Sequence, residues 1–286
     1  MLKLFHEEIK NKNIKNIKYL SLLSGDKGAI FNMLCYKGHL EIAKVIWKFF
    51  RKECELNMGD TFLRTCENGY LETAKWLWGI SHEEIGRETK IDILYTGEHA
   101  FCYACKNGHL DTAKWLREIF REKIDIHYGG EYAFCHACRN GNIDVVKWLW
   151  EVSLKEIKPI NIHISNEFAF NVACTNGNFN IAKWLWEISY HSIDIHIDNE
   201  RIFCDTCRFG HLDIVKWLWE ISQKETPINI HISNECPFIY ACIGERLDVA
   251  RWLWEISNRS INVHINNDYL FKESPREIID WLNTIK

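Results

Sequence analysis

The sequence predicts an all-α solenoid of stacked helix-turn-helix units joined by short extended arms. The main observation is a tryptophan anchor that recurs at intervals of 26, 31, 39, 33, 36, 33, 35 and 29 residues. A period of this size is typical of repeat proteins, because one unit is too small to bury its own apolar face and must stack on its neighbours. The anchors, with weaker units at both ends, are Tyr19, Val45, Trp76, Trp115, Trp148, Trp184, Trp217, Trp252 and Trp281.

Three further columns keep a fixed register with the anchor and support the same fold. Fourteen residues before it stands a phenylalanine: Phe31, Phe62, Phe101, Phe134, Phe170, Phe203 and Phe238. Ten residues before it stands a cysteine: Cys35, Cys66, Cys105, Cys138, Cys174, Cys207 and Cys242. Seven residues before it, in all full units but the last, stands a glycine: Gly38, Gly69, Gly108, Gly141, Gly177 and Gly210.

Each unit is expected to begin with a helix that starts at an Asn-Glu pair and stops at the glycine. In Asn199-Glu200, for example, Asn can cap the helix and Glu favours its positive end. Glycine supplies the left-handed residue that closes a helix at no steric cost. The second helix carries an aspartate in its first turn and a charged arc of only about a third of its circumference, as expected for a helix between two neighbours. These aspartates are Asp111, Asp144, Asp213 and Asp248.

The arm that follows alternates apolar and polar residues, as in 193–197 (Ile-Asp-Ile-His-Ile), which predicts a short extended segment. The arms carry a histidine column that we interpret as hydrogen-bonding groups that stabilise the turn. Metal binding is the alternative, but stacked helices lie about 8–10 Å apart while zinc–nitrogen bonds are about 2.0–2.1 Å long. The column comprises His127, His163, His196, His231 and His264.

Taken in order, residues 1–286 are expected to form a single array: a degenerate N-terminal cap over 1–23, about seven full repeats over 24–264, and a C-terminal cap over 265–286. The polar stretch 81–90 accounts for the longest interval between anchors. It is either an inserted loop that binds a partner or a neutral insertion without a function. In the last full repeat Glu245 occupies the turn position, which predicts a shifted or strained turn. In the C-terminal cap, Ser274, Pro275 and Glu277 predict a capping box with Pro at the first helical position.

The chain has 12 cysteines, and three pairs fit a CxxC spelling: Cys102/Cys105, Cys135/Cys138 and Cys204/Cys207. Each pair falls inside a predicted helix and recurs with the repeat, so we interpret the cysteines as small buried core residues rather than zinc ligands or disulfides. The paired tryptophans, such as Trp217/Trp219, could stack bases or sugars, but their periodic positions favour packing between units.

Composition and motifs exclude several function classes. The net charge of −4 argues against an extended nucleic-acid groove. No signal peptide or membrane-spanning stretch is visible, so an intracellular protein without a membrane anchor is expected. The sequence contains no Walker loop, nucleophile elbow, HExxH motif or dinucleotide fingerprint. We therefore expect no catalytic residues, no cofactor and no metal.

The stretch 107–116 (Asn-Gly-His-Leu-Asp-Thr-Ala-Lys-Trp-Leu) resembles the Gly-His-Leu-Glu-Val-Val-Lys core of ankyrin repeats, and Asp125-Ile126-His127 stands where that family has Asp-Val-Asn. The family's Thr-Pro-Leu-His segment is absent. The Trp-Leu-Trp-Glu-Ile-Ser helices and the long arms resemble divergent ankyrin proteins of large DNA viruses of amoebae. The resemblance implies a fold more strongly than a function, because ankyrin arrays share a scaffold rather than a chemistry.

The resemblance implies a non-enzymatic scaffold, expected to be a monomer in the host cytoplasm, that binds a host or viral protein through arm tips and the exposed face of the first helices. The alternative is a structural or assembly component of a viral particle. Specificity is expected at positions that vary between units, two residues after the Phe column and one after the Cys column. These are Tyr103, Lys106, His136, Arg139, Val172, Thr175, Asp205, Arg208, Tyr240 and Ile243.

Overall fold

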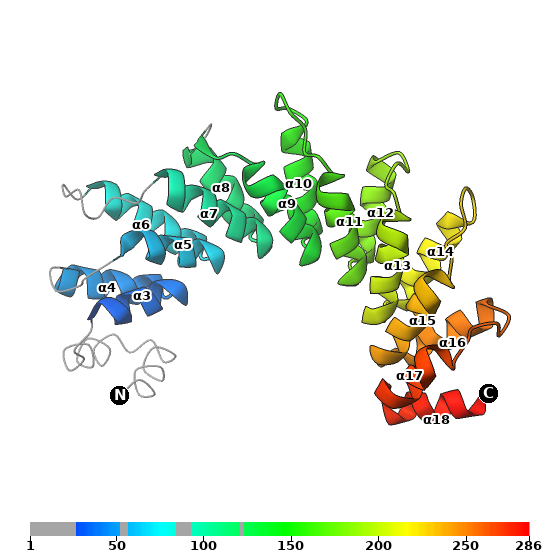
Figure 1. Ribbon diagram of the computed structural model, residues 1–286. Helices are drawn as coiled ribbons and strands as arrows, with labels where there is room; N and C mark the ends of the chain where they lie inside the picture. The colour runs from blue at the N-terminus through cyan, green and yellow to red at the C-terminus, as the bar shows by residue number, and fades with distance from the viewer. Residues whose placement is uncertain (1–26, 52–56, 84–92, 121–122, 286) are drawn as a thin grey trace. The chain divides into compact units, whose positions relative to one another are not determined.

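The computed structural model describes residues 27–51, 57–83, 93–120 and 123–285, and all regular structure in these residues is helical (Figure 1). The predicted cap over 1–23 and most of the polar stretch 81–90 lie outside the described residues. The all-α solenoid of helix-turn-helix units is therefore confirmed for the described chain, while the predicted boundaries of a single array stay a prediction.

The helices fall into two compact units. One unit comprises residues 1–137 and 144–157, and the other comprises residues 138–143 and 158–286. The first contains α3 (Lys27–Tyr36), α4 (Leu40–Phe50), α5 (Met58–Glu67), α6 (Leu71–Glu83), α7 (Ile93–Lys106), α8 (Leu110–Phe120), most of α9 (Tyr128–Arg139) and nearly all of α10 (Ile143–Ser153). The second contains α11 (Ile164–Thr175), α12 (Phe179–Ile188), α13 (Ile197–Phe209), α14 (Leu212–Ser222), α15 (Ile232–Ile243), α16 (Leu247–Ile256), α17 (Ile265–Glu273) and α18 (Arg276–Thr284).

Within each unit, consecutive helices pair as hairpins and the hairpins stack side by side (Figure 1). The first helix of a hairpin packs against the first helix of the next, as α5 does on α7 and α13 on α15. The apolar columns of the sequence therefore meet between repeats as well as within them. This is the expected solution for units that are too small to bury a core alone.

The glycine column closes the first helices α3, α5, α7, α9, α11 and α13, as predicted. Gly108 has a φ of 82°. Its N–H donates to the Cys105 carbonyl at 3.1 Å, while the His109 N–H donates to the Ala104 carbonyl at 2.9 Å. These are the two bonds of a Schellman motif, which satisfies carbonyls that the helix end would leave open.

At Gly177 the neighbouring repeat adds a second reason for glycine. A Cβ on Gly177 would lie 2.6 Å from the ring of His211, which follows the turn of the next repeat. His211 Nε2 in turn lies 3.2 Å from the Thr175 carbonyl. The turn is therefore a contact between repeats as well as the end of a helix.

The aromatic and thiol columns form the core, as predicted. All seven phenylalanines of the column have an exposed fraction of 0%. The seven cysteines of the column are also fully buried. Trp217 is only half-buried, yet its ring lies 6.1 Å from Phe170 and 6.4 Å from Trp186 of the preceding repeat. The tryptophans thus pack between repeats, but the phenylalanines rather than the indoles provide the fully buried centre.

The beginning of the first helix differs from the sequence prediction. Asp198, Asn199 and Glu200 have left-handed φ values of 50°, 58° and 61°, and the right-handed helix continues from the residue after them. The predicted capping role of Asn199 is wrong, because an N-cap has extended dihedral angles. Glu200 lies in the first turn of the helix, as predicted, but it is buried with 7% exposure.

This left-handed turn brings the histidine column onto the buried glutamates. Nδ1 of His196 lies 2.9 Å from a carboxylate oxygen of Glu200, four residues later. We call this pairing the His–Glu clasp. It recurs as His127–Glu131, His163–Glu167 and His231–Glu235, with an Asp in the last copy, His264–Asp268. The predicted role of the histidines as hydrogen-bonding groups at the turn is confirmed.

The three clasps of the second unit that contain a glutamate also hold the arm of the following repeat. Oε1 of Glu200 accepts a hydrogen bond from the Asn229 N–H at 3.3 Å, and Glu167 accepts one from the Asp194 N–H at 3.4 Å. A buried carboxylate is costly unless its oxygens are hydrogen-bonded. Here the histidine of its own repeat and the backbone of the next repeat satisfy it together.

The arms are extended without becoming strands in the described residues. Ile193 and Ile195 are buried, while Asp194 between them is exposed, as the alternation predicts. Oδ1 of Asp194 accepts a bond from the His196 N–H at 2.9 Å. This side chain-to-backbone bond turns the arm into the clasp.

The last repeat and the C-terminal cap depart from the regular pattern. Glu245 has a φ of 63° and takes the left-handed position that glycine holds elsewhere, so the predicted strained turn is confirmed. The predicted capping box is wrong. Helix α18 begins after Pro275 without a side-chain cap, and the buried Ser274 hydroxyl has no hydrogen-bond partner.

Candidate binding surfaces

The ten residues predicted for recognition lie on the first helices α7, α9, α11, α13 and α15. Nine of them are exposed or half-buried, and Val172 is the exception, with 5% exposure. Val172 is therefore removed from the predicted surface, because its side chain is buried. We call the side of the first helices that carries the other nine residues the first-helix face.

In the first unit, this face contains a hollow between α5 and α7 with a volume of about 350 Å³. Tyr103 of the predicted set lines it. The other lining residues come from the same two helices and the residue before α5: Asn57, Gly59, Asp60, Leu63, Arg64, Thr96 and His99. The hollow therefore offers an aromatic ring, an imidazole and both signs of charge within one site.

Hydrogen bonds fix the charged groups of this hollow. The Tyr36 hydroxyl donates to Oδ2 of Asp60 at 2.9 Å, and Arg64 donates to Glu67 at 2.8 Å. Burial, reinforced by the hydrogen bond to Asp60, raises the pKa of Tyr36 to about 12. The hydrogen bond to Glu67 raises the pKa of Arg64. The tyrosine thus stays protonated and holds the Asp60 carboxylate, while the Arg64 guanidinium that lines the hollow stays charged at neutral pH.

The sequence prediction included only Tyr103 of the eight lining residues of this hollow, and among those it missed are Asp60, Arg64 and His99. Arg64 belongs to the column two residues after phenylalanine, one repeat before Tyr103, where the predicted set begins. Asp60 and His99 belong to a column two residues before phenylalanine. Their signal was available, because that second column also changes from repeat to repeat: it continues with Tyr132, Phe168, Arg201 and Cys236.

Aromatic and basic groups continue along the face in the first unit. The Lys106 ammonium lies 5.8 Å from the centre of the Tyr103 ring. On α9, the rings of Tyr132 and His136 lie 4.0 Å apart. Amphipathic rings of this kind are common in protein interfaces, because they bury much area with little loss of side-chain freedom.

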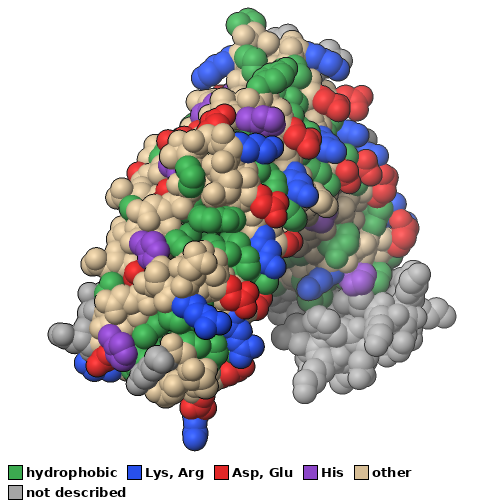
Figure 2. Space-filling model, turned by 90° about the vertical axis from the view of Figure 1, so that its right-hand side faces the viewer, with side chains coloured by type: hydrophobic (Ala, Val, Ile, Leu, Met, Phe, Trp, Pro, Cys, Tyr) green, Lys and Arg blue, Asp and Glu red, His purple; other side chains and the backbone are tan. Residues whose placement is uncertain are grey.

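In the second unit, the face has a different composition. The Arg208 guanidinium lies 5.7 Å from the centre of the Tyr240 ring, and Arg201 lies 3.5 Å from Asp205. Arg139 similarly lies 5.7 Å from the Phe168 ring. The half-buried Thr175 and Ile243 complete the predicted set in this unit. Figure 2 shows acidic and basic side chains interspersed on the side of the molecule that it presents.

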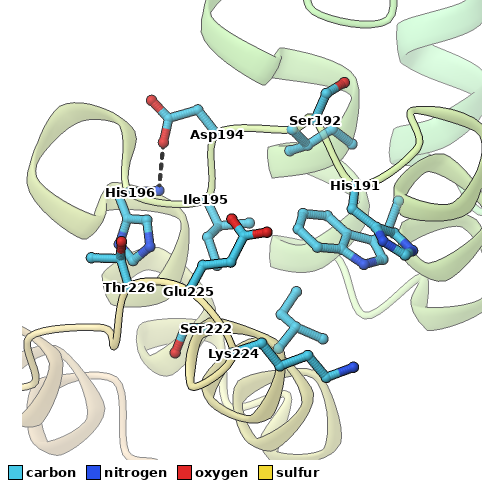
Figure 3. Close-up of a pocket in the computed structure, with 12 residues that line it drawn as sticks. His191, Ser192, Asp194, Ile195, His196, Ser222, Lys224, Glu225 and Thr226 are labelled. Atoms are coloured by element: carbon cyan, nitrogen blue, oxygen red, sulfur yellow. Dashed lines mark hydrogen bonds between the residues drawn. The ribbon is translucent and has the colours of Figure 1, made fainter.

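A second hollow, of about 370 Å³, lies among the arms of the second unit (Figure 3). Its labelled side chains come from two consecutive arms and, with Ser222, from the end of α14. The ring of Trp186 stacks on His191 with 5.2 Å between centroids. The backbone bond from His196 to Asp194 shapes one wall. Lys224, Glu225 and Thr226 belong to the other arm. This hollow lies at the arms, where the family resemblance predicts contacts with a partner.

The described residues hold no cluster of three or more His, Cys, Asp or Glu that could bind a metal ion. Across the same residues, no helix has both the length and the apolar composition required to cross a bilayer. What the two hollows share is a set of aromatic, charged and hydrogen-bonding side chains on a periodic scaffold, which is an arrangement suited to recognition.

Stacked helical hairpins with glycine turns and variable first helices define a helical-repeat solenoid. More specifically, the chain belongs to the ankyrin-repeat family, because the family described as ankyrin repeats (3 copies) matches residues 62–155, 101–199 and 170–267. Among solved structures, the chain is similar to the crystal structure of the human ASB11 ankyrin repeat domain, with a TM-score of 0.49 and 15% identity over 79% of this chain and 97% of that one. No curated protein has a significantly similar sequence.

Proposed function

We propose that the chain is a non-enzymatic scaffold that binds another protein through its first-helix face, with the hollow between α5 and α7 as an anchoring site. Ankyrin repeats generally serve as protein interaction domains, and no catalytic family matches the chain. The observation that supports the proposal is the placement of varying charged and aromatic residues, Arg64, His99 and Tyr103, around one hollow on an otherwise periodic scaffold.

The composition of this hollow supports recognition of a polypeptide segment. Tyrosine and arginine are the side chains most often found at the energetic centre of protein interfaces, where truncation typically costs about 2 kcal/mol or more. A side chain that enters the hollow would meet an aromatic ring, an imidazole and the charged groups of Asp60 and Arg64.

The test compares two triple variants in quantitative affinity capture from cells that produce the protein. The first variant changes the hollow: Arg64→Ala, His99→Ala and Tyr103→Ala. The matched control changes exposed residues on the second helices: Glu72→Ala, Lys75→Ala and Glu118→Ala. We expect a defined set of captured proteins to be depleted at least about tenfold by the first variant, since loss of one hot-spot residue alone can have that effect, and to be retained by the control.

Retention of every captured protein by the first variant, with both variants folded by circular dichroism, would contradict the proposal. The alternative role, as a structural or assembly component of a viral particle, predicts recovery with capsid proteins only and no effect of the hollow variant. The captured set therefore distinguishes the two roles.

We also propose, on the resemblance of the Trp-Leu-Trp-Glu-Ile-Ser helices, that the protein is of viral origin and acts in the host cytoplasm as a monomer. The net charge of −4 supports a protein rather than a nucleic acid as the partner. Light scattering of the purified chain tests the monomer, and fluorescence microscopy of a tagged chain tests the location.

A further inference from the structure

The hollow among the arms of the second unit, which we call the arm hollow, contains none of the residues of the first-helix face. It has a volume of about 370 Å³ and is lined by residues 191–196, 221–222 and 224–226 and by Trp186 (Figure 3). All of these residues belong to the second compact unit. Because most of the lining is polar, its hydrogen-bonding groups determine which ligand the hollow can hold.

One wall of the arm hollow contains a clasp histidine whose outer nitrogen has no partner in the described chain. In the clasp of α15, Nε2 of His231 lies 3.4 Å from Oγ of Ser260 in the following arm. Ser260 stands four residues before the next clasp histidine, and the corresponding residue after His196 is Pro227. Proline has neither a hydroxyl group nor an N–H. In agreement, no described residue forms a hydrogen bond with Nε2 of His196.

The groups that line the arm hollow are mainly hydrogen-bond acceptors. Nδ1 of His196 lies 2.9 Å from the Glu200 carboxylate, so the neutral ring carries its hydrogen there and presents Nε2 as an acceptor. Oδ1 of Asp194 accepts the His196 N–H at 2.9 Å, which leaves Oδ2 for another donor. The exposed Glu225 carboxylate comes from the other arm and forms no ion pair with a described residue. Two carboxylates and an imidazole nitrogen thus line one hollow.

A pair of stacked rings lies on another side of the arm hollow. The planes of the Trp186 and His191 rings are inclined by 19°, with 5.2 Å between their centres. Trp186 is held in place by the rings of Phe170 and Trp217, each 6.4 Å away. His191 is exposed. A planar cation can extend such a stack, because the face of an aromatic ring attracts positive charge.

The charges of the lining favour a cation over an anion. Lys224 is the one Lys or Arg among the 12 lining residues, and it is opposed by the carboxylates of Asp194 and Glu225. Figure 3 shows the Lys224 ammonium directed away from Asp194 and His196. An anion in the hollow would therefore meet two carboxylates, whereas a cation would be attracted by both.

We propose that the arm hollow binds the arginine side chain of a partner polypeptide. The guanidinium group is planar, has five N–H donors and no acceptor, and stacks on aromatic rings, so it matches both the acceptors and the rings of the hollow. A lysine ammonium can pair with the carboxylates but cannot extend the ring stack. The inference rests on the proposed role as a protein-binding scaffold only for the source of the arginine, because the hollow itself can be tested with arginine alone.

The experiment titrates the isotope-labelled full chain with blocked arginine (N-acetyl-arginine methylamide) at neutral pH and follows the amide and indole N–H signals by NMR. We expect saturable shifts at residues 191–196 and 224–226 and at the Trp186 indole, with a dissociation constant in the millimolar range, as is usual for one side chain. Blocked citrulline, which has the same shape without the charge, should bind at least about tenfold more weakly. Blocked lysine should bind at least about threefold more weakly, because it does not stack.

Variants test the contribution of single groups to this affinity. Glu225→Gln should weaken the binding of blocked arginine at least about threefold, since it removes one ion pair. His191→Ala should weaken it about twofold through loss of stacking. Lys224→Ala should bind at least as tightly as the unaltered chain. The matched control is Glu220→Gln, which changes an exposed carboxylate of α14 outside the hollow and should leave the affinity unchanged. The dispersion of the amide signals establishes that each variant is folded.

Several outcomes would overturn the arginine site: no saturable shift, shifts confined to other residues, equal binding of blocked citrulline or lysine, or tighter binding of inorganic phosphate than of blocked arginine. Equal losses in Glu225→Gln and Glu220→Gln would also overturn it. None of these outcomes bears on the first-helix face, which the capture experiment tests separately. Loss of that proposal with intact arginine binding would conversely leave the arm hollow as the recognition site.

Discussion

The first helices begin in two different ways: with a side-chain cap at α5, and with a clasp at α9 and at the first helices of the second unit. Helix α5 has a conventional start, in which Oδ1 of Asn57 accepts the Asp60 N–H at 3.1 Å. Helix α13 instead follows three left-handed residues and the buried Glu200, which His196 holds at 2.9 Å. The cap involves one repeat alone. The clasp involves two, since Glu200 also accepts a bond from the Asn229 N–H of the next arm.

The difference shows how a solenoid can link its repeats through polar groups as well as through its apolar core. A left-handed residue other than glycine costs roughly 1–2 kcal/mol, so three in succession need compensation. The compensation is a carboxylate whose hydrogen bonds are shielded from water, where such bonds are strengthened by the low local dielectric. The clasp therefore couples the conformation of one repeat to the position of the next arm.

The largest expected effect is a loss of stability when a buried phenylalanine of the column is removed, because both compact units contain this column. We expect Phe203→Ala to reduce the free energy of unfolding by roughly 3–5 kcal/mol, and Phe62→Ala to do the same, because both rings are fully buried and their removal leaves a cavity. Urea denaturation followed by tryptophan fluorescence measures both. A loss below about 1 kcal/mol at either site would show that the aromatic column does not form a common core.

The second-largest effect is expected when the glutamate of a clasp is removed, compared with the glutamate at the same position of α7. Glu200→Ala removes the clasp and leaves the His196 ring and the Asn229 N–H without their acceptor. We expect a loss of roughly 2–3 kcal/mol, as for hydrogen bonds to a charged group. The matched control is Glu98→Ala on α7, which occupies the same column but has Leu94 in the place of the histidine. Its expected loss is under about 1 kcal/mol.

Hydrogen exchange of the arm that contains Asn229 sharpens the same comparison. In Glu200→Ala this arm should exchange faster, while Glu98→Ala should leave its protection unchanged. Equal losses of stability in the two variants, with no change in the arm, would show that the clasp does not couple neighbouring repeats.

A smaller effect is expected at the conventional start. Asn57→Ala removes the cap of α5 and should reduce the free energy of unfolding by about 1 kcal/mol. Exchange should increase at the first turn of α5 alone, because the cap holds no residue of another repeat. An increase that extends to the helices of the neighbouring repeats would mean that the cap, like the clasp, couples one repeat to another.

The smallest effect tests the strain in the clasped repeats. Ser233 is exposed and has a φ of 48°, whereas the clasp of α9 carries Gly129 and Gly130 at the corresponding turn. We expect Ser233→Gly to stabilise the chain by about 0.5 kcal/mol, since relief of left-handed strain exceeds the added flexibility of the unfolded chain only slightly. Destabilisation by 1 kcal/mol or more would contradict the assignment of strain to this turn.

Much of the fold could be predicted from the spacing of the recurring residues. The phenylalanine, cysteine and glycine columns each have one physical role that repeats with the period, so their burial and their left-handed turns followed directly. Nine of the ten predicted surface residues are accessible, because variation among otherwise constant neighbours marks positions that packing leaves free. The prediction that Val172 is exposed was wrong, because a position that varies between repeats can still be buried.

The His–Glu clasp could not be predicted from residue spacing. An Asn-Glu pair before an apolar helix ordinarily predicts a cap and a dipole contact, both of them local. Burial of Glu200 depends on the arm of the next repeat, which supplies the Asn229 N–H.

The sequence by itself determined the class of the fold, the repeating core and the side of the helices left open to vary, because these follow from which residues recur at a fixed period. The tertiary structure alone decided which polar groups meet: a histidine with a buried carboxylate of its own repeat, and the arm of the next repeat with that same carboxylate. The physical reason is that period fixes the position of a side chain on its own helix, whereas contact with the next repeat depends on the stacking of the hairpins and on the left-handed turns.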